Sequence, residues 1–554
     1  MFKLKFGKPA GAKESILALL GDTLHLKDAL YTLGFKYNSE KSSWTNPIFS
    51  PHVVDYLEEV CPDIEISPIV REQYKKYLTR PTPIFENLCK SEMLFPHQSE
   101  GLKFLQKAGS GLLAYAIGTG KSGCSLSYAE YLGVNTLVVC PAKLRKQWEE
   151  EIVKFTNGSF GIKVAGTQVE RTKIWNSIDK YHYAIISYES FLNPHDINYI
   201  ENYVNNGLII FDEITKLKNP KSKTFKAAFG VRQKAKFAVG LSGSPLENGL
   251  QDVYALMRLI TPYYIPNYEV FAKNFLKQSS HEFFNPHTGR KIRYNKIDGE
   301  KNVELFRDIL KPIMIRKTRE EVLQLPPEST IKYDIELTRE QIEIENILRA
   351  LARDYPEYIL KWFIFAMENL IHPCLINVGA IAETNPFEAF EIESRIGQGL
   401  TPRMETISEI LEEIGSDQKI IIFSKYVRAL DLIQNKILAP NGYQFKEVSG
   451  RVKHPEKELE SFKTSSTENI LCMTQAGQYG LNITEATLLM IIDKPLNPAK
   501  LDQLKGRIYR KGQEKPVTYF ELISQSPTEQ RIEEILNSKK EISQKVLARE
   551  VLLL

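Results

Sequence analysis

The stretch LLAYAIGTGKS, residues 112–122, runs from a short apolar strand directly into a polar loop. The loop consists of Gly118, Thr119, Gly120, Lys121 and Ser122. Glycines let consecutive backbone N–H groups curl around phosphate oxygens, the lysine adds charge for the β- and γ-phosphates, and the serine hydroxyl can ligate Mg²⁺. The full pattern G-x-x-x-x-G-K-[ST] requires glycine at position 115, where this chain has Tyr115. The stretch therefore predicts a phosphate-binding loop on a partial match; a chance GKS after an apolar run is the alternative.

The chain has 554 residues, of which 43% are hydrophobic and 25% are charged. This length predicts about three or four domains, each able to bury its own core. No apolar run approaches the ~18 residues that a membrane span needs, and the N-terminus MFKLKFGKPAGAKE has no continuous apolar signal core. We therefore expect an intracellular, cytoplasmic protein. A net charge of +4 is too small to indicate a nucleic-acid partner, so any basic surface must be local.

Six cysteines are scattered along the chain, without C-x-x-C spacing and without clustered histidines. They are Cys61, Cys89, Cys124, Cys140, Cys374 and Cys472. This distribution favours reduced, mostly buried thiols over a zinc site or disulfides.

From Phe95 onward, continuous apolar runs alternate with helical or loop stretches. The first group of runs comprises residues 111–116, 136–140, 183–187, 207–212 and 237–242. The second group comprises residues 419–424, 443–449, 469–473, 488–493 and 517–522. Strands that crossover helices bury on both faces have this composition. We therefore predict an α/β fold with two parallel sheets in two lobes, over residues 91–262 and 401–525.

Residues 1–90 precede these lobes and predict a small α+β accessory domain. Its pattern indicates a helix over residues 25–33, a stop at Gly34 and two short strands that end near Trp44. Two roles stay open for this domain, a compact appendage with Trp44 and Phe35 in its core or a contact with nucleic acid.

Two further regions are mostly helical in their periodicity. Residues 263–400, interrupted by a polar stretch near residues 285–301, predict helical protrusions and an inter-lobe linker, or a plain helical spacer. Residues 526–554 predict an amphipathic C-terminal helix that packs on the second lobe or on a partner.

An acidic pair follows the strand at residues 207–212. Asp212 ends the strand and Glu213 comes next, at the place where an open α/β sheet binds its ligand. Asp212 is suited to hold Mg²⁺ through water, and Glu213 to polarise the water that attacks a γ-phosphate. Acidic dipeptides are common on solvated surfaces, which is the alternative. They are much less common directly after an apolar strand that lies downstream of a GKS motif. We therefore predict that Lys121, Asp212 and Glu213 are catalytic.

The second lobe contains LDQLKGRIYRKGQ, in which Gln503, Arg507 and Arg510 are spaced by four and three residues. On a helix this spacing aligns the three side chains on one face. Arginines offered from a second lobe would neutralise the charge that develops on a transferred phosphoryl group. We predict that Arg507 and Arg510 are catalytic; a solvated basic helix face is the alternative.

The order of the motifs resembles that of the superfamily two helicase-type ATPases, and within them the SWI/SNF-type double-stranded DNA translocases. The motifs are FPHQSEGLKFL, IGTGKS, VVCPAKLRKQWEEE, IISYESF, IIFDEITKLKN, LSGSPLEN, IIIFSKY, MTQAGQYGLN and QLKGRIYRKGQ, in chain order over about 420 residues. Three stretches narrow the resemblance to this branch: KLKN (216–219), IMIRKTREEVLQLPP (313–327) and LIHPCL (370–375).

The resemblance implies two RecA-like lobes that bind ATP with Mg²⁺ and hydrolyse it. It implies that Gln98 contacts the adenine, that Gly480 and Gln503 also contact the nucleotide, and that Ser122 and Asp212 hold the metal. It also implies that Ser242 and Ser244 couple the nucleotide site to the nucleic-acid site.

The chain departs from the family's pattern at a few positions. Thr215 stands where histidine is usual, Tyr115 where the residue is usually acidic or small, and Ser122 replaces threonine. Gln478 and Tyr479 stand where smaller residues are usual. None of these departures removes a group that hydrolysis needs. The departure at Thr215 affects the expected link from the acidic pair to the γ-phosphate.

By the same resemblance, DNA is expected to lie across both lobes and to be held through its phosphates. The implied contacts are Lys143, Ser187, Tyr188, Lys216, Lys218, Lys425, Thr474 and Gln475. Ammonium and hydroxyl groups of this kind fix register on a backbone without reading bases. The stretch LKDALYTLGFKYNSEKSSW weakly resembles the HARP-like modules found beside translocases that remodel forked DNA.

Together, these patterns predict a DNA-dependent ATPase that translocates on duplex DNA and remodels forked or branched DNA or protein–DNA complexes. One alternative is a strand-separating DNA or RNA helicase, although no wedge is identifiable in the sequence. Another is an ATP-gated DNA clamp that recruits protein partners through its N-terminal module or last helix, against which the intact Glu213 and Arg510 argue. The compact length suggests a bacterium or its phage as the source.

Overall fold

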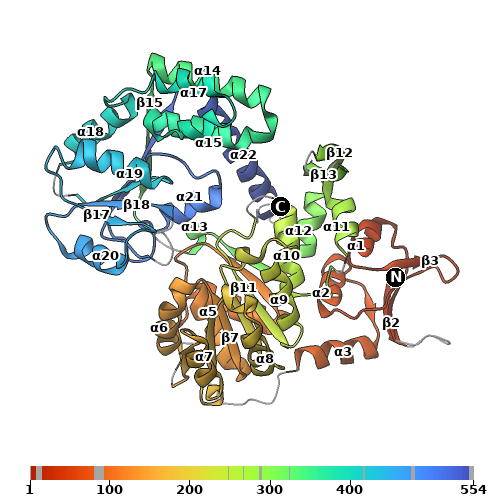
Figure 1. Cartoon of the computed structure of the whole chain (residues 1–554). Helices are drawn as coiled ribbons and strands as arrows, with labels where there is room; N and C mark the ends of the chain where they lie inside the picture. Colours follow the sequence, from red (N-terminus) through yellow and green to blue (C-terminus); the bar gives the residue numbers. More distant parts are fainter. Residues whose placement is uncertain are drawn as a thin grey trace. The chain divides into compact units, whose positions relative to one another are not determined.

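The computed structural model describes residues 2–7, 15–79, 93–156, 158–246, 249–265, 267–285, 290–322, 325–415, 418–475 and 481–547. The chain folds into two compact units. The first comprises Met1–Val322 and Glu541–Leu554, and the second comprises Leu323–Lys540. Each unit contains a parallel sheet with helices packed against it (Figure 1).

In its described part, the first unit has a seven-stranded parallel sheet in the order β14-β6-β11-β10-β7-β9-β8. The strands are β6 (Gly111–Tyr115), β7 (Thr136–Cys140), β8 (Gly161–Lys163), β9 (Tyr183–Ser187), β10 (Leu208–Asp212), β11 (Phe237–Leu241) and β14 (Met314–Lys317). Alternate residues of the strands enter two cores, Leu113 in one and Leu112 in the other. The first core includes side chains of α4 (Pro96–Ala108), α5 (Lys121–Leu132) and α6 (Arg145–Phe155). The second includes side chains of α7 (Gln168–Trp175), α8 (Pro194–Tyr203), α9 (Lys223–Arg232) and α10 (Leu250–Ile260).

The second unit repeats this plan with a six-stranded parallel sheet over its described residues, in the order β15-β20-β19-β16-β18-β17. The strands are β15 (Glu328–Ile335), β16 (Ile420–Phe423), β17 (Phe445–Val448), β18 (Ile470–Met473), β19 (Leu488–Ile491) and β20 (Val517–Ser524). The helices packed on them are α18 (Pro402–Ile414), α19 (Val427–Ile433), α20 (Pro455–Thr464) and α21 (Pro498–Lys505). The predicted α/β class with two lobes is confirmed.

Two strands lie where the sequence predicts a helical linker. β14 pairs with β6, and β15 pairs with β20 over eight residue pairs. Both are edge strands, and β15 reads ESTIKYDI with mostly exposed residues, so it lacks the apolar run that marks the central strands. The lobe boundaries predicted at residues 262 and 401 therefore leave out one strand of each sheet.

The N-terminal residues form a five-stranded sheet, over their described part, in the order β3-β4-β2-β1-β5. Its elements are β1 (Lys3–Gly7), β2 (Ile16–Leu20), α1 (Lys27–Thr32), β3 (Lys36–Asn38), β4 (Ser43–Asn46), α2 (Pro51–Val60), β5 (Glu65–Ile66) and α3 (Pro68–Leu78). The predicted helix, the stop at Gly34 (φ +87°) and the two short strands are present, and Phe35 and Trp44 are buried. The module is not separate, however: it shares one core with α10, α11 (Tyr268–Phe275) and α12 (Val303–Leu310). Asn274 of α11 also donates a hydrogen bond to the Thr32 hydroxyl at 2.7 Å.

Asp55 in this module gives a pH-dependent prediction. Its side chain is 8% exposed and accepts a hydrogen bond from the Tyr74 hydroxyl at 2.6 Å. Burial raises the pKa of Asp55 to about 6, so its folded form binds a proton more tightly than the unfolded chain, whose pKa is about 3.9. Its contribution to stability is therefore complete below about pH 4 and is lost as the pH rises through about 6. We expect Asp55→Asn, which keeps an acceptor for Tyr74, to raise the free energy of unfolding by about 3 kcal/mol at pH 8 and to change it little at pH 4.

Denaturant unfolding at the two pH values measures this difference. Asp63→Asn is the control, because Asp63 is exposed and the same loss of charge there should leave both curves unchanged. An Asp55→Asn protein that unfolds like the wild type at pH 8 would contradict the assignment.

The chain segment predicted as a helical linker, residues 263–400, is helical only in part. A hairpin of β12 (Leu276–Asn285) and β13 (Arg290–Glu300) occupies the polar interruption. In the second unit, α14 (Arg339–Asp354), α15 (Ile359–Ile371), α16 (Val378–Ala382) and α17 (Pro386–Glu393) form a helical protrusion. The C-terminal helix α22 (Pro527–Leu547) packs Ile532 and Leu536 against α15. Across the part of the chain that the structure describes, we find no helix with the length and apolar character to cross a membrane.

Candidate nucleotide-binding site

Neighbouring strands bring three predicted loops to one edge of the first sheet. Leu241 of β11 lies between Leu113 of β6 and Asp212 of β10 in the strand register. Because the three strands are parallel, their carboxyl ends meet at this edge. The phosphate loop follows β6, the acidic pair ends β10, and the segment with Ser242 follows β11.

The phosphate loop has the backbone that its glycines predict. Gly118 and Gly120 have φ values of +82° and +80°, a region that side chains disfavour. α5 begins at Lys121, so Lys121 and Ser122 lie in its first turn. The Lys121 ammonium donates hydrogen bonds to the carbonyl oxygens of Tyr115 at 2.9 Å and Ala116 at 3.3 Å. The backbone N–H groups at this helix start and the lysine together offer a site for phosphate.

Tyr115, at the end of β6, and Gln98, on α4, support this loop. Tyr115 is fully buried, and its hydroxyl donates to the carbonyl of His97 at 2.8 Å. Gln98 accepts a hydrogen bond from the Phe95 N–H at 2.9 Å and donates to the carbonyl of Gly120 at 2.7 Å. The tyrosine at position 115 thus connects the strand before the loop to α4 through a buried hydrogen bond. Gln98 touches the phosphate loop itself, and an adenine contact remains a prediction.

Asp212 is held by two side chains from other segments and by the N–H of the next residue. Its carboxylate accepts hydrogen bonds from the Trp148 indole at 2.9 Å and from the Glu213 N–H at 3.0 Å. Its carbonyl accepts one from the Tyr188 hydroxyl at 2.6 Å. Burial, with the neighbouring Glu213 charge, raises the pKa of Asp212, and the Trp148 hydrogen bond and the Lys121 charge oppose that rise. We did not predict the role of Trp148, whose only signal is one aromatic side chain in the otherwise polar helix start RKQWEEE.

Glu213 has an unusual backbone. It lies in the left-handed region, with φ +51° and ψ +50°, and directly precedes the short helix Ile214–Leu217. This conformation disfavours a non-glycine residue by roughly 1–2 kcal/mol and is often found at functional sites. The surrounding structure therefore holds the Glu213 backbone in a strained conformation, which sets the direction of its side chain.

The segment after β11 lies against the phosphate loop. The Ser242 N–H donates to the Leu113 carbonyl of β6 at 3.2 Å, and the Ser244 N–H donates to the Ser242 hydroxyl at 3.1 Å. A Cβ atom at Gly243 would lie 2.9 Å from the side chain of Ile117, which directly precedes the loop. This close approach gives Ser242 and Ser244 a physical link to the nucleotide site.

The arginines of the second unit converge, but not on a helix. α21 ends at Lys505, so the prediction that one helix face aligns Gln503, Arg507 and Arg510 is wrong. Arg507 and Arg510 instead lie in the turns that follow, and both donate to the Leu481 carbonyl, at 3.2 and 3.3 Å. The Lys500 ammonium donates a hydrogen bond to the side-chain amide oxygen (Oε1) of Gln503 at 3.3 Å. The predicted nucleotide contact at Gly480 lies outside the described residues.

The turns that carry the arginines are held by Gln513, a residue whose role the sequence does not reveal. Its buried amide nitrogen lies 3.0 to 3.1 Å from the carbonyl oxygens of Thr484, Ala486 and Ile508. These contacts hold the turns that the chain forms here instead of the predicted helix.

The residues predicted to contact DNA differ in exposure. Lys143 and Lys216 are exposed after β7 and β10, and Lys218 is half-buried. Ser187 and Tyr188 are buried. The Tyr188 hydroxyl binds the Asp212 carbonyl, so the structure corrects its expected role as a surface contact.

The candidates in the second unit show a similar division. The Lys425 ammonium lies 3.4 Å from Asp493 and is mostly covered. Thr474 is buried, and Gln475 is half-buried. Within this group, therefore, the buried Thr474 does not have the exposed hydroxyl that a phosphate contact would need.

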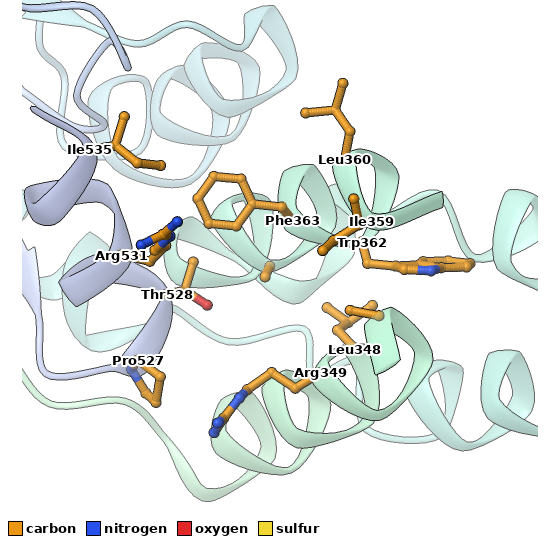
Figure 2. Close-up of a pocket in the computed structure, with 12 residues that line it drawn as sticks. Leu348, Arg349, Ile359, Leu360, Trp362, Phe363, Pro527, Thr528, Arg531 and Ile535 are labelled. Atoms are coloured by element: carbon orange, nitrogen blue, oxygen red, sulfur yellow. The ribbon is translucent and has the colours of Figure 1, made fainter. Parts of the chain in front are cut away.

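A separate apolar cavity of about 380 Å³ lies in the second unit, lined by α14, α15 and α22 (Figure 2). Leu348, Trp362 and Phe363 form much of its wall, and Arg349 and Arg531 are its charged members. Its described lining includes no glycine and no carboxylate. Because a phosphate loop and a metal site both need such groups, we do not assign the nucleotide to this cavity.

Two parallel sheets flanked by helices, in two units, define an α/β protein of two RecA-like lobes. The model of the SNF2-related domain matches residues 20–357, and that of the helicase conserved C-terminal domain matches residues 402–512. The chain belongs to the SNF2-related family of helicase-like ATPases.

Its relatives include larger proteins. It is 27% identical to a chromodomain-helicase-DNA-binding protein 1-like protein of Danio rerio, over 80% of this chain and 43% of that one. It is 25% identical to DNA repair and recombination protein RAD54-like of Drosophila willistoni (87% of this chain, 67% of that one) and of Drosophila mojavensis (82% and 64%). The chain thus spans from under half to about two thirds of the length of these relatives. These animal relatives give no support to the expected bacterial or phage source.

Among solved structures, the Sulfolobus solfataricus SWI2/SNF2 ATPase core in complex with dsDNA matches with a TM-score of 0.37 and 22% identity. The match covers 85% of this chain and 95% of that one. This similarity is too low to support an inference.

Proposed function

We propose that this protein is a DNA-dependent ATPase that moves along duplex DNA and remodels forked or branched DNA or protein–DNA complexes. The observation that carries the proposal is the meeting of the phosphate loop, the acidic pair and the Ser242 segment at one sheet edge. A second RecA-like unit, with two converging arginines, completes the set of groups that ATP-driven movement needs.

Each residue at the site has a chemical role. Lys121 neutralises charge on the β- and γ-phosphates, and Gln98, Gly480 and Gln503 position the nucleotide. Glu213 orients the attacking water and accepts its proton. Arg507 and Arg510 neutralise charge on the transferred phosphoryl group, so that hydrolysis depends on the state of both lobes.

The oxygen groups at the edge suit a magnesium ion. Mg²⁺ prefers hydroxyl, carboxylate and water oxygens, and Ser122 and Asp212 supply the first two. When bound, the metal neutralises charge on the phosphates. The raised pKa of Asp212 fits a carboxylate whose buried charge a cation would offset.

DNA is the proposed partner, bound through its phosphates and without sequence preference. Lys143, Lys216 and Lys218 lie in the short segments that follow β7 and β10, and Lys425 and Gln475 follow strands of the second sheet. Lysine contacts of this kind give affinity that falls with salt. Two of the relatives are named for DNA repair and recombination, which supports a branched or recombining DNA substrate.

Displacement of a triplex-forming strand from duplex DNA tests movement directly. We expect ATP-dependent displacement by the wild type and none by Lys121→Ala. A protein that binds duplex DNA and hydrolyses ATP but never displaces the third strand would overturn the motor and favour the clamp. Separation of the strands of a forked duplex would favour a helicase.

A further inference from the structure

The hairpin β12–β13 stands apart from the sheets of the first unit. Its strands pair antiparallel from Leu276 and Glu300 at the base to Asn285 and Arg290, and they form a sheet of their own. The ten residues of β12, at a rise of about 3.4 Å each, give a ribbon about 34 Å long. In Figure 1 the ribbon lies beyond α11 and α12. A lone two-stranded hairpin is only marginally stable, so its base must be held.

The base of the hairpin is fixed to the body of the first unit. Leu276 is buried in the core that the N-terminal module shares with α10–α12. The Lys301 N–H donates to the Phe275 carbonyl at 2.9 Å, which closes the base. The Asn302 side chain donates to the Asn274 carbonyl at 2.9 Å. The base of the ribbon is therefore fixed to the unit at three points.

The base also contacts the helix that follows the nucleotide site. The Glu300 carboxylate accepts a hydrogen bond from the Leu250 N–H at 2.8 Å, at the start of α10. A negative charge near the N-terminus of a helix stabilises the helix. α10 is the next helix after Ser242 and Ser244, so the hairpin is joined to the chain segment that follows β11.

The hairpin carries unpaired positive charge. Lys277, Lys291 and Lys296 are exposed, and within the described part of the chain no carboxylate pairs with any of them. The β13 sequence RKIRYNKIDGE contains four lysines and arginines against two acidic residues. Lys291 and Lys296 are an odd number of positions apart on one strand, so they lie on opposite faces of the ribbon.

Positive charge on both faces matches a duplex groove. The major groove is about 12 Å wide and admits a two-stranded β-ribbon, with a phosphate backbone on each side of it. Lysines on opposite faces can then contact phosphates of both backbones. Such contacts fix position without reading sequence.

We propose that the β12–β13 hairpin is a DNA-binding arm that lies in a groove of duplex DNA and contacts the phosphates on both sides through Lys277, Lys291 and Lys296. The proposal rests on the proposed function for its choice of DNA as the ligand. The arm adds a contact to those expected at the carboxyl edges of the two sheets.

The salt dependence of DNA binding by the full chain tests the arm. The probe is a labelled linear duplex, and its affinity is measured by fluorescence anisotropy from 50 to 200 mM KCl. We expect the triple change Lys277→Gln, Lys291→Gln, Lys296→Gln to lower the slope of log affinity against log salt by about 2 to 3, because each lost phosphate contact removes about 0.9. Lys291→Gln alone should lower it by about 1.

The matched control is Lys173→Gln, Lys180→Gln, Lys234→Gln, which removes the same charge from exposed lysines. Lys180 and Lys234 precede β9 and β11, at the edge of the sheet opposite to the nucleotide site. The control should keep the wild-type slope. A hairpin triple variant that keeps that slope would overturn the arm.

The same proteins separate the two proposals. If wild-type hydrolysis responds to DNA but the hairpin change leaves the salt slope intact, the arm is wrong and the motor stands. If the hairpin change lowers the slope but wild-type hydrolysis ignores DNA, the motor is wrong and the arm stands.

Discussion

Replacing Glu213 by glutamine is expected to lower the rate of ATP hydrolysis by about 10³-fold, because a positioned general base contributes about 10²- to 10⁴-fold. Glutamine has almost the same size but cannot take the proton of the attacking water. ATP binding should change by less than about threefold, since Lys121 and the loop N–H groups that hold the phosphates remain. Single-turnover hydrolysis and equilibrium binding of a fluorescent ATP analogue measure the two effects separately.

The backbone of Glu213 supplies a second variant that tests the same residue. Glycine accepts the left-handed conformation without strain, so Glu213→Gly should raise the free energy of unfolding by about 1 kcal/mol. Its rate of ATP hydrolysis should fall as much as that of Glu213→Gln. Glu213→Gln keeps the strain and should leave stability unchanged. Hydrolysis by Glu213→Gln at the wild-type rate would contradict the role of this residue.

Replacing Arg510 by alanine is expected to lower kcat by about 10³-fold, the lower end of the range for an arginine that stabilises phosphoryl transfer. ATP affinity should be nearly unchanged, because the phosphate loop belongs to the other unit. The turn that carries Arg510 is held by Gln513, so the change should not disturb the fold. Steady-state hydrolysis, binding of the nucleotide and thermal unfolding measure the three properties.

The control for Arg510 is Arg531→Ala in the same unit. Arg531 is exposed and pairs with Glu534 on α22, so its loss should leave kcat unchanged. If Arg510→Ala weakens ATP binding and kcat in equal measure, or affects neither, then the arginine does not act on the transferred phosphoryl group.

The central strands and the phosphate loop could be predicted because their signals are local. Buried parallel strands read as continuous apolar runs, and the positive φ angles of Gly118 and Gly120 explain why that loop needs glycine. The acidic pair follows from its place after such a run. The same reasoning placed the helix, Gly34 and the two strands of the N-terminal module.

What escaped prediction depends on partners distant in the sequence. β15 is polar and mostly exposed, and only its pairing with β20 makes it a strand. The hairpin β12–β13 is rich in polar residues, and most of its residues whose burial is described are exposed, so no apolar run marks it. The arginine loop reads as helix by its spacing, but Gly506 follows the last helical residue and Gln513 holds the turns. The bond from Trp148 to Asp212 joins residues 64 positions apart.

The response of ATP hydrolysis to duplex DNA tests the account most directly. The rate is measured for the wild type with Mg²⁺ and saturating ATP, with and without linear duplex, and for Lys121→Ala as the blank. We expect duplex DNA to raise the rate by at least about tenfold, which corresponds to about 1.4 kcal/mol of barrier. Equal hydrolysis with and without DNA, above the Lys121→Ala blank, would contradict a DNA-driven motor.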